Sequence, residues 1–226
     1  ECLLSPVWKW VHIHGPGGVG KTTLLRYFAE TMDSNRYIYL DGHSGFQCPQ
    51  DFLAQIRHSL PEPVEDREEV ELLNAHAAEH GSVVLLLDTF EMWGAIEDWL
   101  RRDWIPKLSP HVKIYSTGRY PLDGQWMRNG WHALVHNMEL QPLTFQEVQT
   151  YAHTRGISNQ QIVASLQQFS NGLPLALSLA CEIILRNGNT RFLEQDQKDH
   201  IITHLIVELT KIGRAQAEDG IRDFCV

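Results

Sequence analysis

The chain has 226 residues, enough for one α/β domain with its own core and a small appendage. Its 43% hydrophobic and 21% charged residues are ordinary for a globular protein, and the net charge of −9 argues against broad attachment to DNA or anionic membranes. The four cysteines lie far apart, so we expect free thiols in a reducing, cytoplasmic compartment. Signal-peptide and membrane-spanning patterns are absent from the sequence, and we expect no membrane partner.

Five β-rich stretches separated by helical patterns predict the first part of the fold. The expected strands are 8–14, 36–40, 82–87, 112–116 and a fifth within 131–140. The expected helices between them are 22–32, 50–60, 68–79 and 93–108. Strands that alternate with helices form right-handed βαβ units, so we expect a parallel sheet flanked by helices.

The pattern changes to helices alone after Leu140. Thr144 and Glu147 match a capping box at the start of a helix, and Pro174 suits the first turn of another. We therefore predict an α/β domain followed by a small helical domain. The predicted divisions are 1–141 for the α/β domain, 142–198 for the helical lid and 199–226 for a following domain, possibly a winged helix, or a linker helix.

A phosphate-binding loop follows the first predicted strand. The segment GPGGVGKTT fits the pattern G-x-x-x-x-G-K-[ST], in which backbone N–H groups and a helix N-terminus surround phosphate oxygens. Lys21 is expected to reach the β- and γ-phosphates, and the Thr22 hydroxyl to bind Mg²⁺. The predicted nucleotide-binding residues here are Gly15, Pro16, Gly17, Gly18, Val19, Gly20, Lys21, Thr22 and Thr23. The sequence thus predicts a P-loop NTPase with a five-stranded parallel sheet.

An acidic residue ends the most apolar strand, as a P-loop site requires. Asp88 follows the run VVLLL and is expected to hold Mg²⁺ through water, while Glu91 could polarise the attacking water. The alternatives are a turn aspartate for Asp88 and a solvated helix cap for Glu91. The fourth strand ends in STGR, which would direct Arg119 to the γ-phosphate, although a surface arginine is the simpler alternative.

The order of these motifs resembles the STAND class of P-loop NTPases, which includes NB-ARC and NACHT proteins. The resemblance rests on the P-loop, LLLDTFE, STGR, LQPLT at Leu140–Thr144 and GLPLAL at Gly172–Leu177. It implies that Pro174 packs on adenine and that ATP/ADP exchange drives rearrangement and self-association, with slow hydrolysis. Two features of the class are not found, the upstream GR-x-x-E element and the winged-helix histidine.

The resemblance also implies sensor and effector domains outside this chain, which begins with Glu1 and is expected to be part of a longer protein. The function predicted first is therefore a regulatory ATP/ADP switch. The alternative is an AAA+-like ATPase motor or loader that acts on nucleic acid or protein. A small-molecule phosphotransferase is a third possibility, but residues 120–170 are poor in the arginines that its lid would need.

Adenine is favoured over guanine because the chain lacks an N-K-x-D element. A nucleic-acid partner is not expected, given the acidic net charge. The seven tryptophans allow a base-stacking platform, yet core packing or a partner face suits their helical spacing better.

Overall fold

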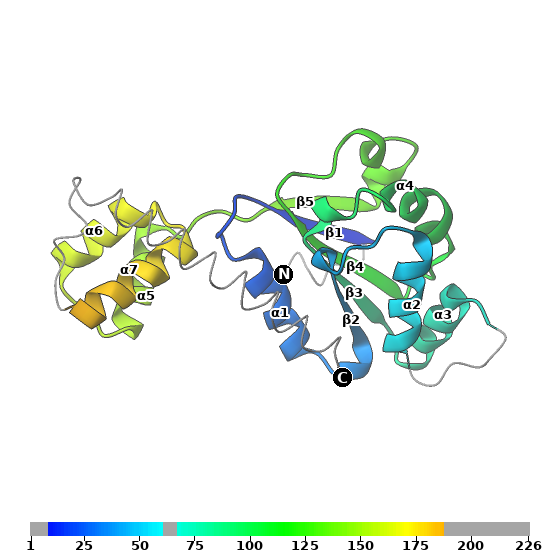
Figure 1. The fold of residues 1–226 in the computed structure, drawn as a ribbon, viewed down its shortest axis with the longest axis horizontal. Helices are drawn as coiled ribbons and strands as arrows, with labels where there is room; N and C mark the ends of the chain where they lie inside the picture. Colours follow the sequence, from blue (N-terminus) through cyan, green and yellow to red (C-terminus); the bar gives the residue numbers. More distant parts are fainter. Residues whose placement is uncertain (1–8, 61–66, 188–226) are drawn as a thin grey trace. The chain divides into compact units, whose positions relative to one another are not determined.

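The computed structural model describes residues 9–60 and 67–187 of the chain. It divides into two compact units, Glu1–Gln141 and Pro142–Val226, which are described separately (Figure 1). Within the described ranges, every helix is too short or too polar to cross a membrane. The predicted segment 199–226 and the end of the predicted lid lie outside the described residues.

Five strands and four helices form the framework of the first unit. The strands are β1 (Trp10–His14), β2 (Tyr37–Asp41), β3 (Val83–Asp88), β4 (Val112–Gly118) and β5 (Val135–Glu139). The helices are α1 (Lys21–Thr31), α2 (Pro49–Ser59), α3 (Glu69–Glu79) and the short α4 (Glu97–Trp99). The second unit contains α5 (Phe145–Thr154), α6 (Gln160–Ser170) and α7 (Pro174–Asn187).

The strands form one sheet in the order β2-β3-β4-β1-β5, and all neighbours are parallel. The predicted fold class, a five-stranded parallel sheet flanked by helices and followed by helices alone, is confirmed. Because β4 lies between β1 and β3, the carboxyl ends of these three strands meet at one edge of the sheet. Ligands of open parallel sheets bind at this edge.

Helices cover both faces of the sheet, with α1 on one face and α2 and α3 on the other (Figure 1). Leu86 of β3 shares a buried cluster with Leu25 of α1. Its neighbours Leu85 and Leu87 belong to a larger cluster on the opposite face, which also includes Phe52 of α2. This alternation explains why the strand sequence is almost continuously apolar, since both of its faces are covered.

The single helix predicted over 93–108 is wrong in extent. The chain has a short α4, then a π-helical turn at Leu100–Trp104 and a 3-10 turn at Ile105–Lys107. Pro106 lacks a backbone N–H and cannot continue an α-helical ladder, so the segment changes its winding there. The segment still buries Leu100, Trp104 and Ile105.

Aromatic side chains dominate the core on the face covered by α2. The Phe52 ring lies 5.9 Å from Trp93, 5.8 Å from Trp99 and 4.7 Å from Trp104, measured between ring centroids. The edge-on geometry of these pairs is the arrangement that aromatic quadrupoles favour. Trp93 and Trp104 are buried, so these two tryptophans pack in the core, the first of the two roles that their spacing favoured over base stacking.

In the second unit, a capping box determines where α5 begins and a glycine turn precedes α7. Thr144 and Glu147 form the predicted capping box at α5. Gly172 has φ +75°, and a Cβ there would lie 2.2 Å from the carbonyl oxygen of Leu143. The Leu143 N–H donates to the Gly172 carbonyl at 2.8 Å. The glycine of G-L-P is therefore required by the turn that leads into α7.

We expect Phe52→Ala to lower the free energy of unfolding by about 3–5 kcal/mol, because the cavity would lie among three tryptophans. Urea unfolding followed by tryptophan fluorescence measures this change. Tyr27→Ala, at a side chain that is 61% exposed, is the control and should change stability by less than about 0.5 kcal/mol. Equal stabilities for the two variants would contradict the assigned core.

Candidate nucleotide-binding site

The phosphate loop joins β1 to α1 and depends on two glycines with different constraints. A Cβ on Gly15 would lie 2.9 Å from the Leu140 carbonyl oxygen, so the end of β5 leaves no space for a side chain. Gly20 adopts φ +99°, which L-residues rarely accept, immediately before α1 begins at Lys21. The loop therefore places the N-terminus of α1, with its free N–H groups, at the carboxyl edge of the sheet.

The Lys21 side chain folds back over the phosphate loop. Its Nζ donates to the carbonyl oxygens of Gly15 at 2.7 Å and Pro16 at 2.9 Å. Burial lowers the pKa of Lys21, an effect that Glu91 opposes and Arg119 strengthens. The ammonium group is therefore held by two weak neutral acceptors, which phosphate oxygens can replace with stronger charged ones.

Asp88 is 2% exposed and accepts hydrogen bonds on both carboxylate oxygens. Its Oδ1 accepts from the hydroxyls of Thr22, at 3.1 Å, and Thr117, and from the N–H of Thr89 at 2.9 Å. Its Oδ2 accepts from the Tyr39 hydroxyl at 2.7 Å. Pairing of β3 with β2 and β4 puts Tyr39 and Thr117 on either side of this carboxylate. The donors satisfy a buried group that would otherwise be costly.

The oxygens of Thr22 and Asp88 suit a magnesium ion. Both are hard oxygen donors, the kind that Mg²⁺ prefers, and they lie 3.1 Å apart. A hydroxyl and one carboxylate leave most of the shell to water and phosphate, as Mg²⁺ usually requires. The donor set therefore fits the ion that the P-loop pattern implies.

The chain turns sharply after Asp88. Thr89 has φ 53° and ψ 52°, a left-handed conformation that is strained for a β-branched residue. The indole N–H of Trp93 donates to the Asp88 carbonyl at 2.9 Å and holds the turn from the core side. This turn presents Glu91 at the carboxyl edge of the sheet. Strain of this kind is concentrated at functional sites.

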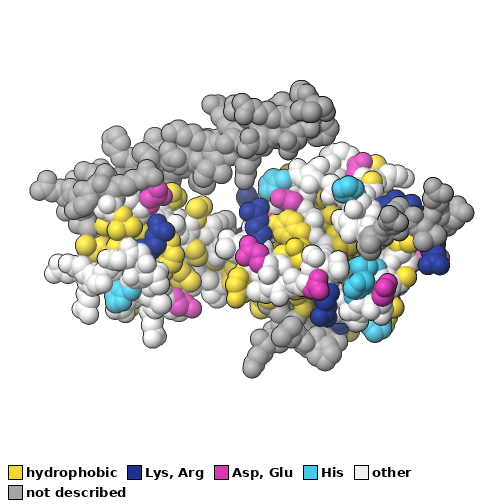
Figure 2. All heavy atoms as spheres, turned by 90° about the horizontal axis from the view of Figure 1, so that it is seen from below, with side chains coloured by type: hydrophobic (Ala, Val, Ile, Leu, Met, Phe, Trp, Pro, Cys, Tyr) yellow, Lys and Arg dark blue, Asp and Glu magenta, His cyan; other side chains and the backbone are white. Residues whose placement is uncertain are grey.

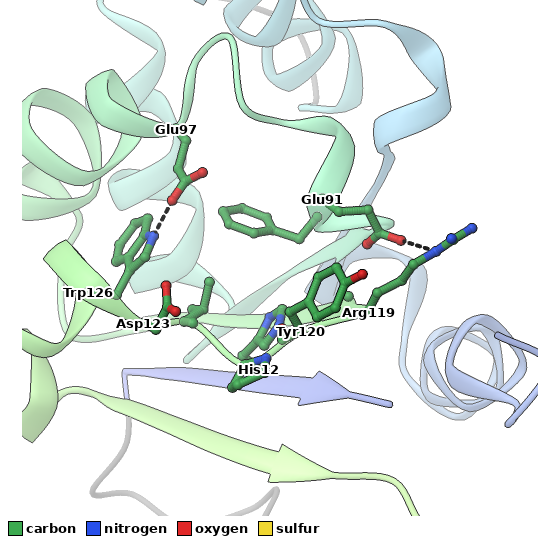
Figure 3. Close-up of a pocket in the computed structure, with 11 residues that line it drawn as sticks. His12, Glu91, Glu97, Arg119, Tyr120, Asp123 and Trp126 are labelled. Carbon is green, nitrogen blue, oxygen red and sulfur yellow. Dashed lines mark hydrogen bonds and ion pairs between the residues drawn. The ribbon is translucent and has the colours of Figure 1, made fainter. Parts of the chain in front are cut away.

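Glu91 and Arg119 form an ion pair at this edge, with 3.1 Å between Arg119 Nε and Glu91 Oε1 (Figure 3). Both side chains line a pocket of about 160 Å³ next to the turn that follows β4. Glu97 and Asp123 line the same pocket, so three carboxylates surround it. Two predicted catalytic side chains therefore lie together, and Arg119 is held by the glutamate.

A buried histidine lies beneath this pocket. His12 is 1% exposed, and its Nε2 lies 2.9 Å from the Tyr120 carbonyl oxygen. Burial lowers the pKa of His12 to about 4, with smaller lowering effects of His14 and Lys21, while the bond to Tyr120 raises it. The imidazole is therefore neutral at neutral pH.

The predicted site residues of the first unit come from three strand ends that meet at one edge. Pro174 begins α7 in the second unit, and its packing on adenine stays a prediction. The contact of Tyr39 with Asp88 was not predicted from the sequence, because the only indication was a hydroxyl group on a residue within an alternating strand. Thr117 was also assigned no role beyond its place in the STGR motif.

Comparisons with known proteins agree with this geometry. A family model described as an AAA domain matches residues 9–102. No curated protein sequence gives a significant match. Among solved structures, a Walker-type ATPase of Pyrococcus abyssi is similar, with 16% identity, a TM-score of 0.62, and coverage of 93% of this chain and 72% of that one. A structure of Drosophila ORC bound to DNA is also similar, with 14% identity, a TM-score of 0.60 and coverage of 90% and 62%.

Both of these solved structures are less than 25% identical to this chain in sequence, so the similarity shows the fold alone. The chain has the fold of a P-loop NTPase, with its phosphate loop after β1 and an acidic residue at the end of β3. The match of residues 9–102 to a model described as an AAA domain agrees with this fold. P-loop ATPases generally bind nucleotide together with Mg²⁺. The chain spans 62% of the matched ORC chain, so that protein's partners are not carried over here.

We expect His12 to make stability fall with acidification. The unfolded histidine binds a proton below about pH 6.5, whereas the folded one stays neutral to about pH 4, so protons favour unfolding in this window. Between pH 7 and pH 4 the wild type should lose about 3 kcal/mol more than His12→Gln, since the other titrating groups are shared. Urea unfolding at both pH values measures the difference. Equal losses of stability in the wild type and in His12→Gln would contradict the burial of a neutral imidazole.

Proposed function

We propose that the chain is the ATP-binding and ATP-hydrolysing module of an AAA-type ATPase that acts on a macromolecular partner, nucleic acid or protein. The observation that carries this proposal is the hydrogen bond between Thr22 of the phosphate loop and buried Asp88, at 3.1 Å. This hydrogen bond joins the phosphate loop to the acidic residue at the end of β3, the two elements that would hold Mg²⁺ and phosphate. The match to an AAA domain over residues 9–102 supports the same class.

ATP binding would begin with a change of partners in the phosphate loop. Lys21 would leave the carbonyl oxygens of Gly15 and Pro16 for the β- and γ-phosphates. Thr22 and Asp88 would hold Mg²⁺, which neutralises phosphate charge. Tyr39 and Thr117 keep the carboxylate of Asp88 oriented through their hydroxyls. The Mg²⁺ ligands are therefore aligned before nucleotide arrives.

Hydrolysis would use the ion pair of Glu91 and Arg119. The γ-phosphate carries more charge than a single carboxylate, so Arg119 would move from Glu91 to the phosphate when ATP binds. Glu91 would then be free to orient and deprotonate the attacking water. The pair therefore links the presence of the γ-phosphate to the availability of the base.

A similar solved structure and the surface charge bear on the class of partner. The similar ORC structure is bound to DNA, which keeps nucleic acid among the candidate partners despite the net charge of −9. On the face seen in Figure 2, basic and acidic side chains are interspersed on each unit, without an extended patch of one sign. A protein partner, including further copies of the chain, suits that surface as well as DNA does.

A second candidate is the STAND-like switch, in which ATP/ADP exchange drives rearrangement and self-association with slow turnover. The arrangement of G-L-P favours it, because Gly172 packs closely on Leu143 and Pro174 begins α7. In this candidate Pro174 would contact adenine and the Glu91–Arg119 pair would slow hydrolysis. Both candidates share the phosphate loop and Asp88, so they differ in how turnover is regulated.

Lys21→Ala should lower the affinities for both ATP and ADP by at least about tenfold, because a charged contact to the phosphates is lost. Competition with a fluorescent ADP analogue measures both affinities. Lys107→Ala, at an exposed lysine of the 3-10 turn, is the matched control and should bind as the wild type does. Full affinity in a folded Lys21→Ala protein would refute the phosphate site.

Glu91→Gln should keep ATP affinity within about threefold and lower the hydrolysis rate by about 10²-fold or more, since an amide cannot accept the proton. Phosphate release with saturating Mg²⁺·ATP measures the rate. Glu71→Gln on the exposed surface of α3 is the control and should hydrolyse ATP normally. Unchanged turnover in Glu91→Gln would remove the glutamate from the mechanism.

The two candidates predict different responses to DNA. An ATPase that acts on DNA should turn over faster when DNA is added, and it should purify with an empty site. A switch should retain ADP through purification and hydrolyse ATP slowly with or without DNA. Measuring bound nucleotide by chromatography, and then phosphate release with and without duplex and single-stranded DNA, separates these outcomes.

A further inference from the structure

We propose that His12 is a positioning residue for Arg119. A buried hydrogen-bonded chain runs from Trp10 through Ser116 to His12 and ends on the Tyr120 backbone, which fixes the turn that carries Arg119. Figure 3 shows His12 beside Tyr120 in the pocket that Arg119 also lines. The inference deepens the proposed function and rests on it, because it assumes that Arg119 reads the γ-phosphate.

The direction of every hydrogen bond in this chain follows from its end groups. The Trp10 indole can only donate, so Ser116 Oγ accepts from Nε1 at 2.6 Å. The Tyr120 carbonyl can only accept, so His12 Nε2 carries a proton and donates at 2.9 Å. A neutral imidazole with a proton on Nε2 has an acceptor at Nδ1, and the Ser116 hydroxyl donates to it at 2.7 Å. One tautomer of His12 is therefore selected.

The chain leaves the imidazole little freedom to move. Trp10, His12 and Ser116 are each no more than 1% exposed, so their side chains have almost no contact with water. The His12 ring packs edge-on against Phe90 at 5.9 Å between centroids. On the other side, a Cβ on Gly118 would lie 2.8 Å from His12 Cε1. The imidazole is in close contact with the backbone immediately before Arg119.

Contacts from two strands hold the turn after β4 immediately beyond the predicted catalytic arginine. His12 of β1 holds Tyr120, the residue after Arg119, through its carbonyl. Asn137 of β5 holds the next part of the turn, accepting from the Leu122 N–H and donating to the Leu122 carbonyl, each at 2.9 Å. The Arg119 backbone is therefore fixed while its side chain remains exposed and able to change partners.

This arrangement differs from simple core filling. An apolar residue of similar size would fill the space of His12 but would remove the donor to the Tyr120 carbonyl and the acceptor of the Ser116 hydroxyl proton. The turn would then be free to shift, and Arg119 would start from a wider range of positions. Pre-organisation lost in this way weakens contacts to the γ-phosphate, which ADP lacks, so the effect should be selective for ATP.

The test compares the affinities for ATP and ADP in a double-mutant cycle of His12→Phe and Arg119→Ala. Arg119→Ala should lower the ratio of ATP to ADP affinity by about tenfold, and His12→Phe by about fivefold. In the double variant the ratio should match that of Arg119→Ala alone, because His12 acts through the arginine. His12→Gln, whose amide N–H can reach the Tyr120 carbonyl, should restore the ratio to within about twofold of the wild type.

Controls separate positioning from general destabilisation. His111→Gln alters a histidine that also contacts a backbone carbonyl, that of Gly81 at 3.2 Å, and should leave the ratio unchanged. Ser116→Ala keeps the imidazole but removes the donor to Nδ1, and should lower the ratio by about threefold even if His12→Phe does not fold. Melting temperatures identify variants that are folded.

Three outcomes would overturn the inference. If Arg119→Ala lowers the ratio while folded His12→Phe and Ser116→Ala leave it unchanged, His12 does not position the arginine and the proposed function still holds. If the effects of His12→Phe and Arg119→Ala multiply in the double variant, the histidine acts by another route. An unchanged ratio in Arg119→Ala would instead refute the arginine's part in the proposed function, and with it the positioning role.

Discussion

The rest of the site depends on the buried carboxylate of Asp88. A charge with 2% exposure persists in the fold only where donors satisfy it, and here α1, β2, β4 and the turn after β3 supply them. These contacts tie the phosphate loop to the sheet through Thr22. They also leave an oxygen pair suited to Mg²⁺. The same interaction therefore stabilises the carboxyl edge of the sheet and prepares it for nucleotide.

Around this carboxylate the site divides into a rigid part and a part that can change partners. Asp88 and His12 are buried and hydrogen-bonded to backbone or to neighbouring strands. Lys21 and Arg119 are held only by carbonyl groups or by Glu91, which the phosphates of ATP can replace. A site of this kind responds to nucleotide by exchanging ion pairs, with little rearrangement of the sheet itself.

The choice between an AAA-type ATPase and a STAND-like switch depends on how this exchange is used. The match of residues 9–102 to a model described as an AAA domain suits the proposed motor or loader at least as well as the switch that the order of motifs first indicated. The switch is favoured by the close packing of Gly172 on Leu143 and by the start of α7 at Pro174.

Local patterns in the sequence were sufficient to predict the five strands, the phosphate loop and the capping box at Thr144, because each depends on neighbouring residues. The winding of 93–108 was not predictable, since Pro106 and the burial of aromatic side chains compete there. Only the tertiary structure brought Tyr39 to Asp88 and His12 to Tyr120. Those pairs join residues 49 and 108 positions apart, and sheet order, which no local periodicity encodes, decided which of them meet.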